Sequence, residues 1–467
     1  MDTSQYGSLM TEILKAFCIC GGLLLVGTFL RAKVKLFQNF YLPACVIGGF
    51  IGLLLSPTVM GNHAILNISA ETNAILSNIP SVLFMLIMAA MPMCSASLSR
   101  KSLRGKGDVW SLAILITIIF CLQFAIGFGV NAAFTAAGRP TYAAFGAELA
   151  QGFTGGHSIA PMHGSMLQSL NQPYWETARG VTITVATVGI IAGIVWGVIL
   201  INIAVRKGYT NYIDKPSSIP EEMRVGLYKS VEDQPWIGKQ TTNSASIDSF
   251  AFHLALILPV VGAGYIINDL VQKYQVPVFK EFAAWVYMLI VMYIVWPIIC
   301  KLKLDRHFNA ETKSKITGTI TEFIIVAAIV SIPLKLVMEY WLPILVTCVL
   351  GLLFTPLILW FGAKKFLVKD WAEKIMGPIG MNHGDFITGV LLIKMVDPNM
   401  KSSALEDFSL AYAIHNLYAL PLFVFIMPYV INHGAVSAAL VCIAQVIVLA
   451  ILLVVCGNLF KKAGSAK

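Results

Sequence analysis

Long, uninterrupted apolar runs follow one another along most of the chain and limit what it can fold into. A run of about 20 apolar residues lets a helix cross the hydrocarbon core of a bilayer. Because the runs are continuous rather than alternating, they favour helices over the strands of a membrane β-barrel. The 467 residues are 57% hydrophobic and only 12% charged, which excludes a cytosolic globular enzyme, a disordered chain and a small disulfide scaffold. The sequence therefore predicts an all-α polytopic membrane protein.

We interpret eleven of these runs as membrane-spanning helices. They cover residues 8–30, 41–58, 79–98, 109–133, 180–204, 249–271, 281–300, 317–338, 341–362, 405–430 and 434–460. Two further stretches, 142–166 and 374–397, are apolar but crowded with Gly, His, Thr and Pro. Irregular backbone at membrane depth is tolerated only where protein or a water-filled cavity surrounds it. We therefore predict that both stretches are re-entrant hairpins.

Basic residues in the loops predict the orientation. Loops on the cytoplasmic side of a membrane carry an excess of Lys and Arg. Loop 99–108 holds several basic residues and loop 59–78 holds none, and a similar alternation continues along the chain. With eleven spans, this places the N-terminus outside and the C-terminus in the cytoplasm. The net charge of +9 is then a topology signal, and we expect no nucleic-acid partner.

The order of the segments repeats within the chain. Residues 1–204 hold four spans, the hairpin 142–166 and a fifth span, and residues 249–430 hold the same series with hairpin 374–397. Five crossings are an odd number, so the second repeat is inverted relative to the first. Residues 205–248 form a charged cytoplasmic linker, and 431–467 add one C-terminal helix and a basic tail. Inverted repeats with broken, Gly-rich segments at matching positions are typical of secondary transporters.

The first hairpin contains Thr154, Gly155, Gly156, His157 and Ser158 in succession. The glycines allow a sharp turn and a close approach of a ligand to the backbone. The two hydroxyls can coordinate a cation or bond a carboxylate, and the N–H groups at a helix N-terminus attract anions. The histidine either contacts a ligand or only bonds the backbone of the turn.

Here the sequence resembles a known family. The Thr-Gly-Gly-His motif at 154–157 is similar to the Ser/Thr-Gly-Gly-His signature of the bacterial sodium/glutamate symporters. Tyr-Leu-Pro at 41–43, Gly-Gly at 48–49 and Ala-Thr-Val-Gly at 186–189 agree with this resemblance. It implies sodium-driven uptake of glutamate or a related anion by two inverted five-span repeats with opposed hairpins, in a homodimer. It also implies that the residues of the 154–157 motif belong to the site.

The second hairpin departs from the family pattern. Where the family has Ala-Thr-Pro after a Gly-rich run, this chain has Thr388 followed by Gly389, and it adds Asn382, His383 and Asp385. This departure keeps the transport class and leaves the cargo open. An acid at membrane depth is costly and by default functional, which indicates a sodium ligand or proton carrier. The alternative is a shallower hairpin that leaves this acid in water.

The spans that follow the hairpins add further candidates. Thr187 can face the site, although threonines in membrane helices often bond their own i−4 carbonyl. Asn416 lies in the matching span of the second repeat, and Glu148 is either a vestibule or a gate residue. The candidate substrate- or ion-binding residues are Thr154, Gly155, Gly156, His157, Ser158, Thr187, Asn382, His383, Asp385, Thr388 and Asn416. The candidate sodium ligands among them are Thr154, Ser158, Asp385 and Thr388.

These observations predict a secondary active transporter and not an enzyme. Sodium, as the coupling ion, and a small anionic or zwitterionic solute would bind between the hairpin tips, with no other cofactor. One alternative is a proton-coupled transporter of another small organic solute, and a channel is another. A third is an intramembrane enzyme that uses His157, His383 and Asp385 as acid–base groups, although the sequence offers it no visible nucleophile or metal motif.

Overall fold

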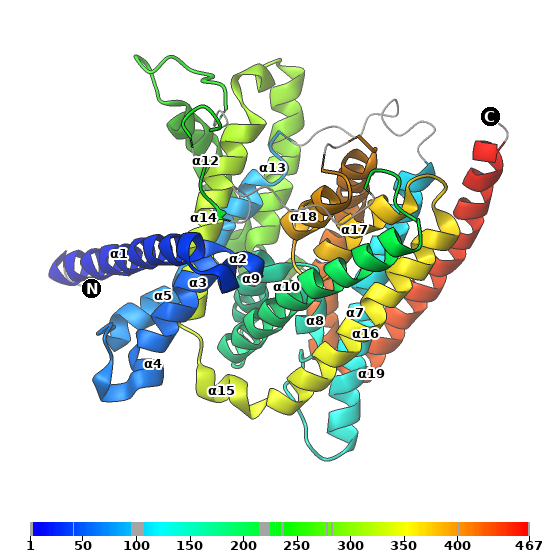
Figure 1. Cartoon of the computed structure of the whole chain (residues 1–467). Helices are drawn as coiled ribbons and strands as arrows, with labels where there is room; N and C mark the ends of the chain where they lie inside the picture. The colour runs from blue at the N-terminus through cyan, green and yellow to red at the C-terminus, as the bar shows by residue number, and fades with distance from the viewer. Residues whose placement is uncertain are drawn as a thin grey trace. The chain divides into compact units, whose positions relative to one another are not determined.

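Helices are the only regular secondary structure among the residues that the computed structural model describes. These residues are 3–40, 42–94, 107–213, 225–228, 230–234, 238–276, 279–281, 284–398 and 401–465. Figure 1 shows their arrangement. The prediction of an all-α protein is therefore confirmed for this part of the chain. Tyr41, the first residue of the Tyr-Leu-Pro sequence at 41–43, and the basic residues of 99–106 lie outside the described part.

Nine helices in the described part are long and apolar enough to cross a membrane. They are α1 (Thr3–Lys33), α3 (Ala44–Leu55) continued by α4 (Pro57–Met60), α5 (Ala70–Ala90), α7 (Gly107–Ala136), α10 (Trp175–Arg206), α12 (Ser249–Tyr274), α13 (Ala284–Lys301), α16 (Trp341–Phe366) and α19 (Ala404–Ser465). Several leave large apolar side chains exposed, including Leu14 on α1, Leu258 on α12 and Leu440 on α19. Such surfaces fit contact with lipid, and the chain is a multi-pass membrane protein.

One predicted segment differs from the structure. The single helix expected over 317–338 is wrong: α14 (Ala310–Val330) ends before Pro333, and a separate short helix, α15 (Leu334–Glu339), follows. Proline has no N–H to donate and disfavours helix in the residue before it, which accounts for the break. The last two predicted spans both lie in α19, in which the non-helical Gly434 separates two helical stretches at the predicted boundary. The count of eleven spans stays a prediction.

The chain divides into two compact units, and the predicted repeats stay a prediction. The first unit comprises Met1–Ser97, Gly164–Glu176 and Val225–Pro333. The second comprises Leu98–His163, Thr177–Arg224 and Leu334–Lys467. Each unit therefore combines helices from both halves of the sequence.

Small residues allow close helix packing in the first unit. A Cβ on Gly48 of α3 would collide with the backbone oxygen of Leu23 on α1, and one on Gly49 would lie 2.8 Å from the Ile329 side chain of α14. Membrane helices approach closely where such residues face each other. The Gly48–Gly49 pair thus allows α3 to pack closely against α1 and α14 in this unit.

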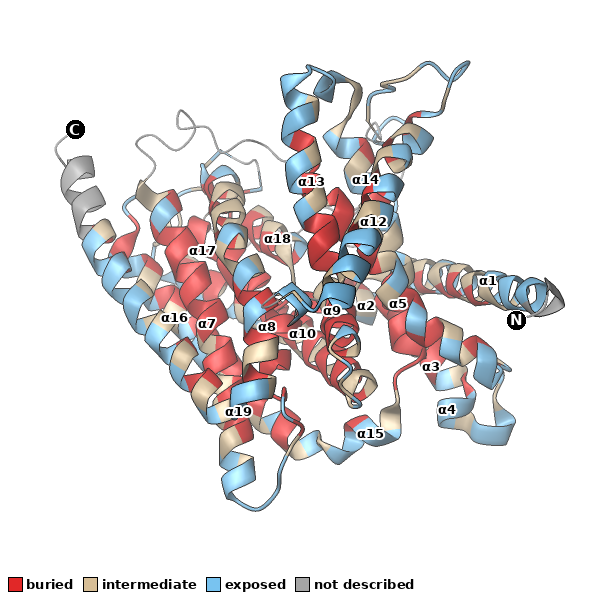
Figure 2. Ribbon diagram, turned by 180° about the vertical axis from the view of Figure 1, so that it is seen from behind, coloured by how far each residue is buried: buried red, intermediate tan, exposed pale blue. Residues whose placement is uncertain are grey.

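In the second unit, α7 packs against α16 and α19 and is largely buried (Figure 2). A buried lysine joins the starts of three helices. Lys374, on α17 (Trp371–Met381), places its Nζ 2.6 Å from Asp108 Oδ2 of α7 and 3.1 Å from Asp407 Oδ2 of α19. Breaking a buried ion pair leaves a charge uncompensated. This cluster therefore holds the first turn of α17 against its neighbours.

Candidate functional site

The first Gly-rich stretch folds as two short helices joined by a tight turn. Helix α8 spans Ala147–Phe153 and α9 spans Gly156–Ser169, with Thr154 as the C-cap of α8. Gly156 adopts a φ of +59°, in the left-handed region that glycine accepts without strain. The helix break expected within 142–166 is confirmed as local geometry, and its membrane depth remains a prediction.

The second stretch has the same plan. Helix α17 ends at Met381 and α18 (Phe386–Val396) follows after Asn382, His383, Gly384 and Asp385. Glycines let the two helices touch, because a Cβ on Gly380 would lie 2.6 Å from the Thr388 oxygen. We call the residues 154–156 and 382–385 the first and second helix breaks.

Both helix breaks belong to the second unit, and they meet there. A Cβ on Gly156 would collide with the backbone oxygen of Gly384 and lie 3.5 Å from the Asp385 Cβ. Thr154 Oγ1 lies 3.1 Å from Asn382 Oδ1. Candidates that are more than two hundred residues apart in the sequence thus come into contact.

A glutamine that the sequence analysis missed connects the two breaks. Gln123, fully buried on α7, accepts a hydrogen bond from Thr154 Oγ1 at 2.7 Å through its Oε1. Its Nε2 donates to the backbone oxygen of Asn382 at 3.0 Å and to Thr355 Oγ1 of α16 at 3.2 Å. The only sequence signal for Gln123 is one amide within an otherwise apolar run.

His157 reaches the helix that follows the first break. Its Nε2 lies 2.9 Å from Thr187 Oγ1, and the Thr187 hydroxyl donates to the Ile183 oxygen of its own helix α10. The threonine oxygen must then accept, so His157 carries its proton on Nε2. Ser158 donates to the Gly155 oxygen at 3.0 Å and so bonds within the turn.

His383 is held by the preceding helix. Its Nδ1 donates to the Ile379 oxygen at 2.8 Å, which leaves Nε2 as the acceptor nitrogen. Nε2 is buried and has no hydrogen-bond partner among the described residues. The ring packs against Phe153 of α8 with centroids 5.6 Å apart. His383 therefore presents an unused acceptor beside α8. We call α8 and α9, the two helices on either side of the first break, the first broken pair.

Asp385 caps α18. Its Oδ1 accepts from the Thr388 N–H at 2.8 Å and from the Thr388 hydroxyl at 2.9 Å. The residue is half-buried, and no Lys or Arg in the described ranges pairs with it. By contrast, α9 has no acidic residue in its first turn. The helix N-termini at the two breaks therefore differ in charge, since only that of α18 carries a carboxylate as its cap.

Among the residues that the structure describes, Asn416 makes no hydrogen bond to either break. It hydrogen-bonds Tyr412, whose ring packs on Phe386 with centroids 5.1 Å apart and lies within electrostatic range of Asp385. The neighbouring His415 turns to α7, with Nδ1 3.1 Å from Thr117 Oγ1. Asn416 thus belongs to the surroundings of the second break rather than to the contact between the breaks.

The sequence profile of the sodium/glutamate symporter family matches residues 9–390. The chain belongs to the sodium/glutamate symporter family. The match includes both helix breaks and ends within α18, so Asn416 and the rest of α19 lie beyond it. A comparison with curated proteins gave no match.

In this symporter-family chain, the acid–base groups of the enzyme alternative do not form a cluster. His157 bonds Thr187, His383 bonds Ile379, and the side chain of Asp385 bonds Thr388. Within the described ranges, no group of three or more His, Cys, Asp or Glu side chains is arranged to hold a metal ion.

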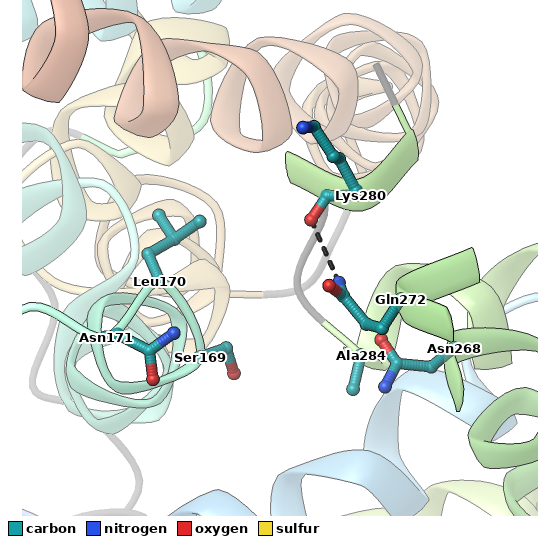
Figure 3. Close-up of a pocket in the computed structure, with 7 residues that line it drawn as sticks. All are labelled: Ser169, Leu170, Asn171, Asn268, Gln272, Lys280 and Ala284. Carbon is teal, nitrogen blue, oxygen red and sulfur yellow. Dashed lines mark hydrogen bonds between the residues drawn. The ribbon is translucent and has the colours of Figure 1, made fainter. Parts of the chain in front are cut away.

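A polar pocket of about 470 Å³ lies in the first unit of this family member and includes none of the candidate site residues. Figure 3 shows Ser169 and Asn171 on one side and Asn268 and Gln272 on the other. Gln272 Nε2 donates to the backbone oxygen of Lys280 at 2.9 Å across part of its wall.

Proposed function

We propose that the protein is a secondary active transporter that moves sodium together with glutamate or a related small carboxylate or amino acid. Membership of the sodium/glutamate symporter family supports this class. The observation that carries the proposal is the contact between two helix breaks whose helix N-termini differ in charge. Broken helices of this kind form substrate and ion sites in secondary transporters.

The carboxylate of the cargo binds at the first break in this proposal. The first N–H groups of α9 have no partner within the helix, and no acidic residue stands in its first turn. His157, with its Nε2–H on the Thr187 oxygen, fixes the start of α9 against α10. An anion at this helix end is therefore attracted by the backbone, and the first turn of α9 itself adds no repelling carboxylate.

Cations bind at the second break. Sodium prefers oxygen ligands, and Asp385 with the Thr388 hydroxyl supplies a charged and a neutral oxygen. Thr154, Asn382 and Gln123 bring three further side-chain oxygens together. An amino group on the cargo would also be attracted by Asp385 and could donate to His383 Nε2, so a zwitterionic amino acid fits better than a simple dicarboxylate.

The transport cycle follows from the predicted inverted repeats. The helices that carry the two breaks move relative to the remaining spans and expose the site to one side of the membrane at a time. The proposal also includes the predicted orientation, with the N-terminus outside and the C-terminus in the cytoplasm of a bacterium. In it both hairpins are re-entrant and the protein assembles as a homodimer. The grouping of both helix breaks in one compact unit supports the proposal.

Uptake into proteoliposomes tests the proposed function. We expect the purified protein to concentrate labelled glutamate, or another member of a panel of amino acids and dicarboxylates, above its external level. This accumulation should require an inward sodium gradient. Accumulation driven by a pH gradient alone would favour a proton-coupled transporter, and flux that only equilibrates the solute would favour a channel. Release of a chemically altered product would favour an enzyme.

Replacing Gln123 by leucine tests whether the contact between the breaks serves the site. Q123L removes the hydrogen bonds to Thr154 and to the Asn382 oxygen. Each is worth about 1 kcal/mol, so we expect the sodium concentration for half-maximal uptake to rise about 30-fold. The control is N202L, because Asn202 on α10 bonds only the Val198 oxygen of its own helix. An unchanged sodium dependence in Q123L would remove Gln123 from the site.

A further inference from the structure

A second buried polar cluster surrounds Glu148, in the first turn of α8. The carboxylate is 1% exposed and receives three hydrogen bonds. Oε1 accepts from the Tyr142 hydroxyl at 2.8 Å and lies 3.2 Å from His163 Nε2, and Oε2 accepts from the Gly146 N–H at 2.6 Å. Glu148 is therefore a buried carboxyl group with three hydrogen-bonding neighbours.

Uncharged groups complete the surroundings of this cluster. From the start of α16, the Tyr340 ring packs on Tyr142 with centroids 5.1 Å apart. From α7, the neutral Asn131 donates to the backbone oxygens of Tyr142, Ala143 and Phe145. The nearest charged side chains in sequence, Arg139 and Glu339, are exposed. Among the hydrogen-bonding partners of Glu148 in the described residues, His163 is the group that can take up a positive charge, and a buried arginine, Arg179, lies on the neighbouring helix α10.

His163 has a vacant nitrogen. The side chain is fully buried on α9 and its Nε2–H points to Glu148, so Nδ1 is an acceptor. Nδ1 has no hydrogen-bond partner among the described residues. With neutral His163 and an ionised Glu148 the pair carries one net negative charge, and a proton on Nδ1 would turn it into a neutral imidazolium–carboxylate pair.

The burial of Nδ1 determines whether His163 can bind this second proton. A buried N–H without an acceptor is costly, so the arrangement seen here disfavours the protonated imidazole. When Nδ1 contacts water or a polar group, the cost of an unpaired N–H disappears, and the negative charge of an ionised Glu148 favours binding of the proton. Proton occupancy and the position of the first broken pair are then linked, since the proton shifts the equilibrium toward the conformation that binds it better.

We propose that Glu148 and His163 form a proton-binding site, separate from the two helix breaks, that binds a proton when the first broken pair moves and releases it when Nδ1 is buried. The link to transport rests on the proposed function, whereas proton binding itself does not. Glu148 and His163 lie outside the candidate sodium ligands and make no hydrogen bond to them in the described residues.

Nitrogen-15 NMR of histidine-labelled protein in nanodiscs tests proton binding without transport. The His163 signal is the one that disappears in H163Q. We expect the neutral Nε2–H form at about pH 8 and the doubly protonated form at about pH 5, with the change lost in E148Q. A His163 signal that keeps one form over this range, or that titrates alike in E148Q, would overturn the proposal.

The pH dependence of uptake tests the link to transport. In the wild type we expect the initial rate at saturating sodium to differ about 10-fold between about pH 5.5 and about pH 8. We expect this ratio to fall below about 2 in H163Q and E148Q and to persist in H433Q, whose histidine is exposed on α19. A wild-type ratio in both site variants would overturn the link. Absence of any sodium-driven uptake in the wild type would instead contradict the proposed function, while the NMR titration would still decide the proton site.

Discussion

Asparagine at position 385 is expected to reduce sodium-driven uptake about 100-fold while leaving the fold in place. Asp385 is the half-buried acid at the second helix break, and D385N removes its charge but keeps its shape. Charged hydrogen-bond and ion contacts are worth about 1.5–3 kcal/mol, which corresponds to a factor of 10 to 100 in binding or rate. Initial rates at a series of sodium concentrations would measure the effect.

The fold should tolerate this change because of the local role of Asp385. Asparagine caps helix N-termini about as well as aspartate, so the bond to the Thr388 N–H persists in D385N. Alanine would lose the cap and about 1 kcal/mol of stability, which makes D385A the comparison that separates capping from charge. D269N, at an exposed position of α12, serves as the matched control. Wild-type rates and sodium dependence in D385N would exclude Asp385 from the site.

Local sequence patterns were sufficient to locate the two helix breaks. Gly155 and Gly384 lie where the structure interrupts the helices, Gly156 begins α9, and Gly380 lies in the last turn of α17. Glycine enrichment within an apolar run predicts a break because both backbone freedom and close approach depend on the absence of a Cβ. The same reasoning could not show that the breaks touch, since the contact of Thr154 with Asn382 depends on how distant helices pack.

Residues inside apolar runs were the ones that sequence reasoning missed. Gln123 lies in an ordinary predicted span, and periodicity cannot tell whether one amide faces lipid, a neighbouring helix or a site. Its partners, Thr154, Thr355 and Asn382, come from three other helices or turns. The break at Pro333 was missed for a different reason. Hydropathy is averaged over a window and is little changed by one proline, whereas the proline interrupts the backbone hydrogen bonds of the helix.

The Glu148–His163 pair shows an intermediate case. The sequence analysis marked Glu148 as a vestibule or gate residue, since an acid beside an apolar run is conspicuous. It did not pair Glu148 with His163, which lies on the other arm of the first broken pair. Only the turn at Gly155 and Gly156, which folds α9 back toward α8, brings the two side chains to 3.2 Å.

Alanine in place of Gly156 is expected to abolish measurable uptake. A left-handed φ of +59° costs a non-glycine residue about 1–2 kcal/mol. The added methyl group would also collide with the Gly384 oxygen and approach the Asp385 Cβ, so the two breaks must separate. Because the proposed site depends on their contact, we expect uptake to fall at least about 100-fold. Initial uptake rates and the thermal unfolding midpoint would be measured together.

A second glycine provides the control for this experiment. Gly129 lies within α7 of the same unit, and a Cβ there would meet no atom within 4 Å. Alanine is the better helix former by about 1 kcal/mol, so G129A should keep its uptake and unfold at the same or a higher temperature. If G156A transported at the wild-type rate, the two breaks would not need the contact seen here, and the site would have to lie elsewhere in the second unit.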